Sequence, residues 1–266
     1  MIGGRFVPAG KLARAALTTM AIGCLLGGSA AGIGERQSPA SPEKLDFTST
    51  GSIAGGIFSS VAFPFKPGIA TRWQEIEKNA GQLGPGNCDG DATCRTRLGI
   101  LEEAVKATQS LPLAQKINAI NRAVNRLIDY RSDKDVYGTL DYWAMPKEIL
   151  AIGKGDCEDF AIMKMAALRS AGVPAESMAL VVLRDSGRNF YHAVLAVSTS
   201  SHTYVLDNLR DVVLTDRQLP QYQALYSLGA QKAWIHGYKR GSEFAMQKRP
   251  TSLETIQPGE GIPNPS

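Results

Sequence analysis

Long apolar segments and one-sided charge are both scarce in this sequence. Of its 266 residues 44% are hydrophobic, yet beyond the N-terminal region no run is long and apolar enough to cross a bilayer. The formal net charge is only +4 at pH 7, and three of the basic residues lie near the N-terminus, at Arg5, Lys11 and Arg14. The composition therefore gives little support for a nucleic-acid partner, and the length fits a single domain with flexible ends.

The N-terminal residues 1–31 have the layout of a secretory signal peptide. The basic residues precede an apolar run, Ala15–Leu26, and Ser29-Ala30-Ala31 offers a cleavage site. About a dozen apolar residues are too few to favour a spanning helix. An uncleaved anchor and a lipidated Cys24 are the alternatives. We therefore expect export to the periplasm.

Cysteine and histidine are both rare, with four and three residues respectively. Loss of Cys24 with the signal peptide would leave three cysteines. Cys88 and Cys94 lie in a Gly- and Asp-rich stretch that could bend enough to let them bridge in an oxidising compartment. Cys157 is then unpaired, so it is either inert in the core or kept free for chemistry.

The apolar pattern predicts one folded domain at residues 67–245. Residues 32–66 are rich in Gly, Ser, Pro and Ala and indicate a flexible leader, and 246–266 indicate a disordered tail. Shorter helices are predicted at 73–79, 95–109 and 113–128, and from Pro146 to a stop at Gly153. A helix that is apolar almost all round is expected from Asp156 to about Ala171. The strand-like runs that follow it are Met178–Leu183, Tyr191–Val197 and Thr203–Leu206. A buried helix followed by antiparallel strands indicates the α+β class.

Cys157 is placed by this pattern in the first turn of the buried helix, with Asp156 as its N-cap. Free backbone N–H groups and the positive end of the helix dipole favour a thiolate there, and the same amides could hold an oxyanion. A nucleophilic thiol also needs a base that can later act as an acid.

His192 and Asp207 are the candidate partners of that thiol. A turn at Ser198–Ser201 would place Asp207 directly across from His192 on the same face of a hairpin. A carboxylate there could orient the imidazole and fix its tautomer. Taken singly, His192 fits a core histidine equally well, and Asp207 a residue that starts a turn. The other two histidines, His202 and His236, have no such facing acid.

Acidic residues surround the cysteine and should raise the pKa of its thiol. They are Asp156, Glu158 and Asp159. One explanation is that acids in a first helical turn favour the dipole and point into water. The other is a bound Ca²⁺, which takes clustered carboxylate oxygens and would cancel the unfavourable field. Asp141 is either a further metal ligand or a cap.

Tyr142 and Trp143 lie just upstream of the cysteine segment. Aromatic side chains near a thiol can wall a substrate groove or donate a hydrogen bond to an oxyanion. Core filling is the alternative for Trp143, because a buried indole removes a large area from water.

The motifs Gly155-Asp156-Cys157-Glu158-Asp159, Tyr191-His192-Ala193-Val194 and Leu206-Asp207-Asn208 together resemble those of the bacterial transglutaminase-like cysteine peptidases. The resemblance covers roughly residues 73–238. It implies a transglutaminase-like, papain-like core, with the helix that starts at the catalytic cysteine packed on an antiparallel sheet carrying the histidine and the aspartate. It also implies a periplasmic cysteine protease with the triad Cys157, His192 and Asp207.

The LapG-like members of that family clip large surface adhesins and so release cells from biofilms. The resemblance to them implies calcium dependence through acids beside the cysteine, here Asp156 and Glu158. It also implies control by an inner-membrane cyclic-di-GMP receptor of the LapD type. The Cys88/Cys94 segment, the long leader and the tail depart from those members.

Two other functions are compatible with the same residues. The triad could pass the acyl group to an amine, as a transglutaminase or amidase-type acyl transferase does. A catalytically silent module could instead use the groove to bind an exported partner.

Overall fold

The computed structural model describes residues 55–66, 68, 70–81, 83–239 and 256–259. They belong to one compact unit that comprises residues 42–266. Its helices are α1 Ala70–Asn79, α2 Ala92–Thr108, α3 Leu113–Leu127, α4 Asp133–Tyr137, α5 Pro146–Ile152 and α6 Cys157–Ser170. None of the helices in these residues has the length and apolar character that a bilayer span requires. The predicted signal peptide lies outside the described residues.

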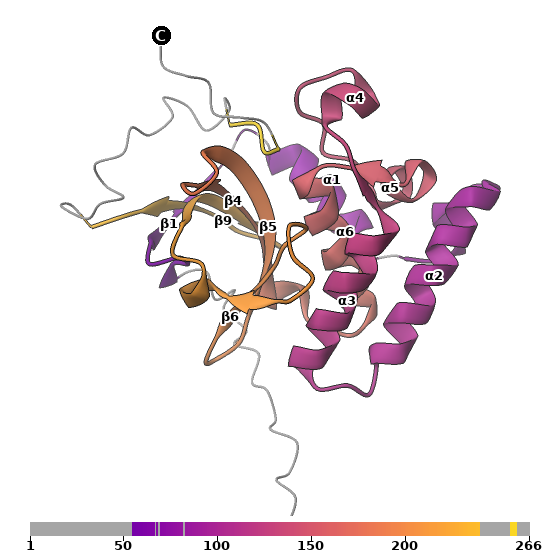
Figure 1. Cartoon of the computed structure of the whole chain (residues 1–266), viewed down its shortest axis with the longest axis horizontal. Coiled ribbons are helices and arrows are strands. Elements are labelled where there is room, and N and C mark those ends of the chain that lie inside the picture. Colours follow the sequence, from indigo (N-terminus) through magenta and orange to yellow (C-terminus); the bar gives the residue numbers. More distant parts are fainter. Residues whose placement is uncertain (1–54, 67, 69, 82, 240–255, 260–266) are drawn as a thin grey trace, which may run out of the picture. The chain divides into compact units, whose positions relative to one another are not determined.

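An antiparallel sheet of seven strands forms the second half of the fold, with the order β1-β9-β8-β4-β5-β6-β7. Its strands are β1 Val61–Phe65, β4 Met178–Asp185, β5 Phe190–Ser198, β6 Thr203–Leu206, β7 Leu214–Thr215, β8 Tyr222–Gly229 and β9 Ala233–Gly237. Two short parallel strands, β2 Asp129–Tyr130 and β3 Lys154–Gly155, pair separately. The α+β prediction is confirmed: Figure 1 shows the helices gathered beside the curved sheet.

The central helix α6 packs against β5 and β4 and is surrounded by α2, α3 and α5 (Figure 1). Every residue from Cys157 to Leu168 is buried, because the helix has almost no polar face to turn to water. Glu158, Asp159 and Lys164 are the polar residues of this stretch, and they are buried as well. Lys164 lies farthest from the start of the helix. Burial lowers the pKa of its ammonium to about 7, and the ammonium lies 5.7 Å from the centre of the Phe160 ring. The helix therefore holds Cys157 firmly against the sheet.

The β5–β6 hairpin has a different register from the predicted one. Leu195 pairs with Leu206 and Ser198 with Thr203, so the connecting residues are Thr199–His202. The Thr199 hydroxyl accepts hydrogen bonds from the N–H groups of Ser201 and His202, which stabilises this turn. The prediction that Asp207 lies directly across from His192 is therefore wrong. The shift amounts to two residues, and since strand side chains alternate between faces, both still share one face as diagonal neighbours.

The first strand lies within the residues that were predicted to form a flexible leader. β1 pairs with β9, and the nearby Ile57 and Phe58 are buried in a second hydrophobic cluster that also contains Tyr222. Three of the five side chains of β1 are exposed, so the strand has little apolar pattern. The segment differs from the prediction because backbone pairing and two isolated apolar residues order it.

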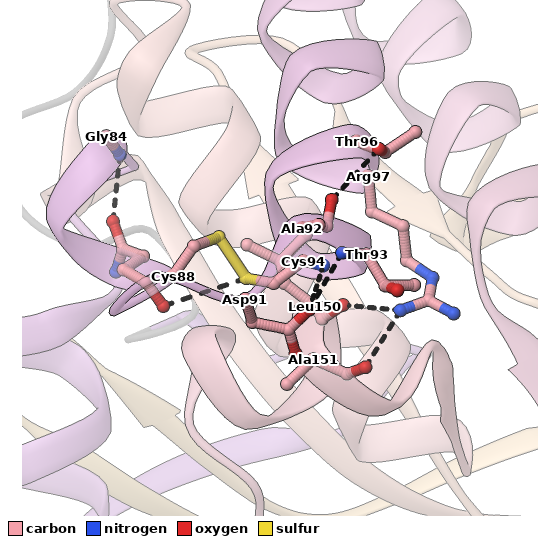
Figure 2. The surroundings of a disulfide bond; sticks show 11 residues. Gly84, Cys88, Asp91, Ala92, Thr93, Cys94, Thr96, Arg97, Leu150 and Ala151 are labelled. Carbon is pink, nitrogen blue, oxygen red and sulfur yellow. Dashed lines mark hydrogen bonds between the residues drawn. A yellow bond between two sulfur atoms is a disulfide. The ribbon is translucent and has the colours of Figure 1, made fainter.

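A disulfide joins Cys88, which lies shortly before α2, to Cys94 in the first turn of that helix (Figure 2). The Asp91 carboxylate caps this helix by accepting from the N–H groups of Thr93 and Cys94. One turn later, Arg97 donates to the carbonyl oxygens of Leu150 and Ala151 near the end of α5. These contacts attach α2 to α5, whose predicted glycine stop at Gly153 is confirmed by a left-handed φ of 70°.

Candidate active site

Cys157 is the first residue of α6 and the free cysteine of the described part of the chain. Its side chain is 1% exposed. The sulfur accepts a hydrogen bond from the Ala193 N–H at 3.2 Å and donates one to Glu158 Oε2 at 3.3 Å. Burial raises the pKa of the Cys157 thiol, the charge of Asp156 raises it further, and the Ala193 N–H opposes both. Asp156 occupies the predicted N-cap position, but its side chain makes no capping hydrogen bond.

His192 and Asp207 are in direct contact: Nε2 of the imidazole lies 2.9 Å from Oδ1 of the carboxylate. Asp207 also accepts from the Tyr222 hydroxyl at 2.6 Å and from the Leu209 N–H at 3.0 Å. Burial alone would raise the pKa of Asp207, but the bonds from His192, Tyr222 and Leu209 hold it below its usual range. An ionised Asp207 can only accept, so Nε2 carries the proton. The neutral imidazole therefore has its lone pair on Nδ1.

The geometry leaves that Nδ1 atom available. It is buried and has no hydrogen-bond partner in the described part of the chain, where the sulfur bonds to Ala193 and Glu158 and not to the imidazole. Ala193 directly follows His192 on β5, so the sulfur lies beside the segment that carries the histidine. The arrangement provides a thiol, a base whose tautomer is fixed, and a carboxylate that orients the base.

Five carboxyl groups gather at the start of α6. Groups of three, drawn from Asp133, Asp141, Asp156, Glu158 and Asp159, lie with their oxygens within 4.8 Å of one another. Burial, followed by the charges of Asp133 and Asp141, raises the pKa of Asp156 to about 7. Burial and the charge of Asp156 also raise the pKa values of Glu158 and Asp159 well above their usual range.

Three oxygens of this acidic cluster are buried without a hydrogen-bond partner in the described residues: Asp156 Oδ1, Glu158 Oε1 and Asp159 Oδ2. Buried carboxylates are stable only when they are protonated, hydrogen-bonded or bound to a cation. Oxygen donors so close together fit a hard divalent cation such as Ca²⁺. The cluster could therefore hold a metal ion beside Cys157.

The structure brings together the predicted ligands Asp141, Asp156 and Glu158, and it adds two that were not predicted as ligands. Asp133 lies in the first turn of α4, far from Cys157 in sequence. The parallel pairing of β2 with β3 places Tyr130 beside Gly155 and so brings α4 next to the cysteine segment. Asp159 was expected to be either solvated or near a cation. It is fully buried and accepts from the Ala144 N–H at 3.1 Å.

Tyr142 and Trp143 have other partners than an oxyanion. Trp143 is buried against Trp73, with ring centres 6.2 Å apart, and its indole N–H donates to Asp141 Oδ1 at 3.1 Å. The Tyr142 hydroxyl donates to Glu148 Oε1 at 3.0 Å. Both donors are thus committed to carboxylates, and core packing describes Trp143 better than an oxyanion contact does.

His236 is buried on β9, which β8 and β4 separate from β5. Its Nδ1 lies 2.8 Å from the Ser60 hydroxyl and its Nε2 lies 2.8 Å from the Ser227 hydroxyl. Burial lowers the pKa of the imidazole to about 4. Both ring nitrogens are occupied by serines, so His236 links strands rather than serving Cys157.

This burial predicts an acid-sensitive contribution of His236 to stability. Above the ordinary pKa of 6.5 the ring is neutral in both the folded and the unfolded chain. Between pH 6.5 and about 4 only the unfolded chain takes up the proton, so the free energy of unfolding falls by up to about 3 kcal/mol. His236→Gln should flatten this part of the stability curve measured by urea unfolding. The exposed His202 provides the control, because His202→Gln should leave the curve unchanged; an equal effect of both variants would contradict the assignment.

Comparison with known proteins agrees with this geometry. The family described as bacterial transglutaminase-like cysteine proteinase, BTLCP, matches residues 88–237. None of the curated proteins is significantly similar in sequence to this chain. The calcium-bound structure of LapG from Legionella pneumophila is 26% identical, covers 61% of this chain and 87% of its own, and has a TM-score of 0.50.

Two further LapG structures from Legionella pneumophila are also similar. One covers 65% of this chain and 90% of its own at 26% identity, with a TM-score of 0.49. The other, treated with EGTA, covers 68% and 95% at 25% identity, with a TM-score of 0.49. The family match spans more than half of the chain and includes Cys157, His192 and Asp207. The chain therefore belongs to the bacterial transglutaminase-like cysteine proteinase family.

Proposed function

We propose that the chain is an exported, calcium-dependent cysteine protease in which Cys157 is the nucleophile, His192 the acid–base and Asp207 the residue that orients the imidazole. The observation that carries this proposal is the contact between His192 and Asp207, which fixes the tautomer of the imidazole. Its Nε2–H donates to the Asp207 carboxylate at 2.9 Å. Its Nδ1 is buried without a hydrogen-bond partner in the described residues, and the next residue on the strand, Ala193, contacts the Cys157 sulfur.

The reaction begins with proton transfer from the Cys157 thiol to His192 Nδ1. The thiolate attacks the carbonyl carbon of a peptide bond, and the N–H groups at the start of α6 stabilise the negative oxygen. His192 Nδ1 then gives the proton to the departing amine, leaving a thioester on Cys157. Water, deprotonated by the same nitrogen, hydrolyses the thioester and restores the thiol. Throughout this sequence Asp207 stays ionised and holds Nε2–H.

Calcium is the cofactor that the acidic cluster supports best. Two groups of carboxylates would hold it, Asp133 with Asp141 and Glu158, and Asp133 with Asp156 and Asp159, so Asp133 is common to both. A bound divalent cation would offset the negative field at the sulfur and favour the thiolate. The LapG structure of similar fold is calcium-bound, which supports calcium binding here.

The substrate class that fits this family is an exported protein, and a large surface adhesin is our specific proposal. Export follows from the predicted signal peptide at residues 1–31 and agrees with the disulfide between Cys88 and Cys94, since disulfides persist in oxidising compartments. An inner-membrane cyclic-di-GMP receptor of the LapD type is the corresponding regulator.

The test is to incubate the purified chain with surface proteins from its own cells and to identify new protein N-termini by mass spectrometry. We expect a few new termini in one or a few large exported proteins, and none with Cys157→Ser. An added primary amine distinguishes the acyl transferase alternative. Hydrolysis predicts free carboxylates at the new C-termini, whereas a dominant amide product would contradict a protease.

A further inference from the structure

The segment Ile256–Gly259 lies against the active site, although it falls within the residues 246–266 that were predicted to be a disordered tail. Ile256 is 3% exposed and belongs to the same hydrophobic cluster as Cys157 and Tyr191. Pro258 is also buried. The Gly259 N–H donates to the Tyr191 carbonyl at 3.0 Å, and the Tyr130 hydroxyl donates to the Gly259 carbonyl at 3.4 Å.

Gly259 is fitted closely to this place. Its φ of +85° lies in the left-handed region, and an added Cβ would approach Asp156 Oδ2 to 3.0 Å and the Tyr130 hydroxyl to 3.2 Å. Asp156 directly precedes the nucleophile, and Tyr191 directly precedes His192. The segment therefore ends between the two residues that flank the proposed catalytic pair.

An unpaired edge of β5 explains why the segment Ile256–Gly259 binds beside the active site. Among the described strands, β6 pairs with β5 only from Leu195 to Ser198, which leaves this edge unpaired from Phe190 to Val194. Backbone groups alternate between the two edges of a strand, so Tyr191 and Ala193 present theirs on the same side. On that side the Ala193 N–H donates to the Cys157 sulfur, and the Tyr191 carbonyl accepts from the Gly259 N–H. An unpaired edge beside a nucleophile is a natural binding place for an extended peptide backbone.

The nucleophile is closed off in this arrangement. Cys157 and His192 are each 1% exposed, whereas a protease must admit both a peptide backbone and water to its sulfur. The segment is short, and it is attached by two hydrogen bonds of Gly259, with the Tyr191 carbonyl and the Tyr130 hydroxyl, and by the buried side chains of Ile256 and Pro258. It can therefore exchange with another peptide without unfolding the domain.

We propose that Ile256–Gly259 is an internal ligand that occupies, on the unpaired edge of β5 beside Cys157, the place that the backbone of the protein substrate takes, and that it leaves when the substrate binds. This proposal rests on the protease function proposed above. It assigns the Tyr191 carbonyl as a substrate-binding group and makes the C-terminal segment a competitive inhibitor in cis.

The experiment compares a chain that ends at Thr255 with a matched chain that ends at Pro263, which keeps the segment and does not place a terminal carboxylate on Gly259 beside Asp156. The first readout is the rate at which iodoacetamide labels Cys157, measured by mass spectrometry on the peptide that contains it. This readout needs no substrate, so it stays valid if the protease proposal fails. If the segment is released from the β5 edge in about a tenth of the full-length molecules, the chain ending at Thr255 is labelled about tenfold faster than the full chain. The chain ending at Pro263 is labelled at the rate of the full chain.

The second readout is cleavage of a protein substrate, in which loss of the segment should lower KM and leave kcat nearly unchanged.

A synthetic peptide of residues 255–263 should slow labelling of the shortened chain, and the same peptide with Gly259→Val should not. Because removal of buried Ile256 could impair folding, full-length Gly259→Val serves as the second variant and should also speed labelling. Equal labelling rates in all these chains would overturn the proposal, as would lower stability of the shortened chain without faster labelling. Equal rates together with normal substrate cleavage would leave the protease function standing.

Discussion

Replacement of Cys157 by alanine is expected to remove proteolysis, lowering kcat/KM by at least about 10⁴-fold. The reaction requires a covalent bond between the sulfur and the substrate carbonyl, and no other thiol of the described residues is free, because Cys88 and Cys94 are bridged. Asp207→Asn should cost about 10³- to 10⁴-fold, since an amide has one accepting oxygen where Asp207 uses two, and an NH₂ group that faces Nε2 favours the wrong tautomer. Cleavage of a defined protein substrate, followed by gel densitometry, measures both effects.

The fold of the Cys157→Ala variant should remain intact. The sulfur fills a buried space and accepts one backbone hydrogen bond, so its loss should lower the free energy of unfolding by about 1 kcal/mol. The unfolding temperature should therefore fall by only about 2–4 °C. Residual cleavage above about 1% of the normal rate would contradict the role of Cys157 as nucleophile.

The sequence predicted the central helix and the strands after it because their signals are local. An apolar run with almost no polar face, and runs rich in Val, Leu and Tyr, placed α6, β4, β5 and β6 within a few residues of their observed bounds. The register of the hairpin was wrong because the turn depends on which hydroxyl bonds which N–H group. The serine-rich stretch 198–201 offers several such choices, and the structure uses Thr199.

The acidic cluster shows a different limit of sequence reasoning. Asp156, Glu158 and Asp159 adjoin the cysteine, so their proximity could be predicted. Asp133 reaches the same place only because two short strands pair in parallel, and strands of two residues leave almost no pattern. The C-terminal segment was missed for a similar reason: Gln257-Pro258-Gly259 has the composition of a loop, and its order comes from tertiary contacts with Tyr130 and Tyr191.

Removal of calcium is expected to abolish activity reversibly. Without a cation Asp156, whose pKa is about 7, is partly ionised near neutral pH, and its charge next to the sulfur disfavours the thiolate. Excess EGTA should therefore lower kcat/KM by at least about tenfold, and added Ca²⁺ in excess of the chelator should restore it, whereas Mg²⁺, which demands a smaller octahedral site, should not. At a calcium concentration of about 100 times Kd, binding should also stabilise the fold by about 2.7 kcal/mol, measured as a rise in the unfolding temperature.

The ligand set can be tested by substituting the residue that the sequence did not suggest. Asp133→Asn should weaken calcium binding about 10- to 100-fold in isothermal titration if the buried cluster holds the ion, because it removes a charge next to Asp156 and Asp159. The exposed Glu103 on α2 supplies the matched control, and Glu103→Gln should bind calcium normally. If only Asp156 and Glu158 held the ion, Asp133→Asn would bind as tightly as the unaltered chain. Full activity in excess EGTA, together with an unfolding temperature that does not respond to Ca²⁺, would show that protonation and hydrogen bonds stabilise these carboxyl groups instead of a cation.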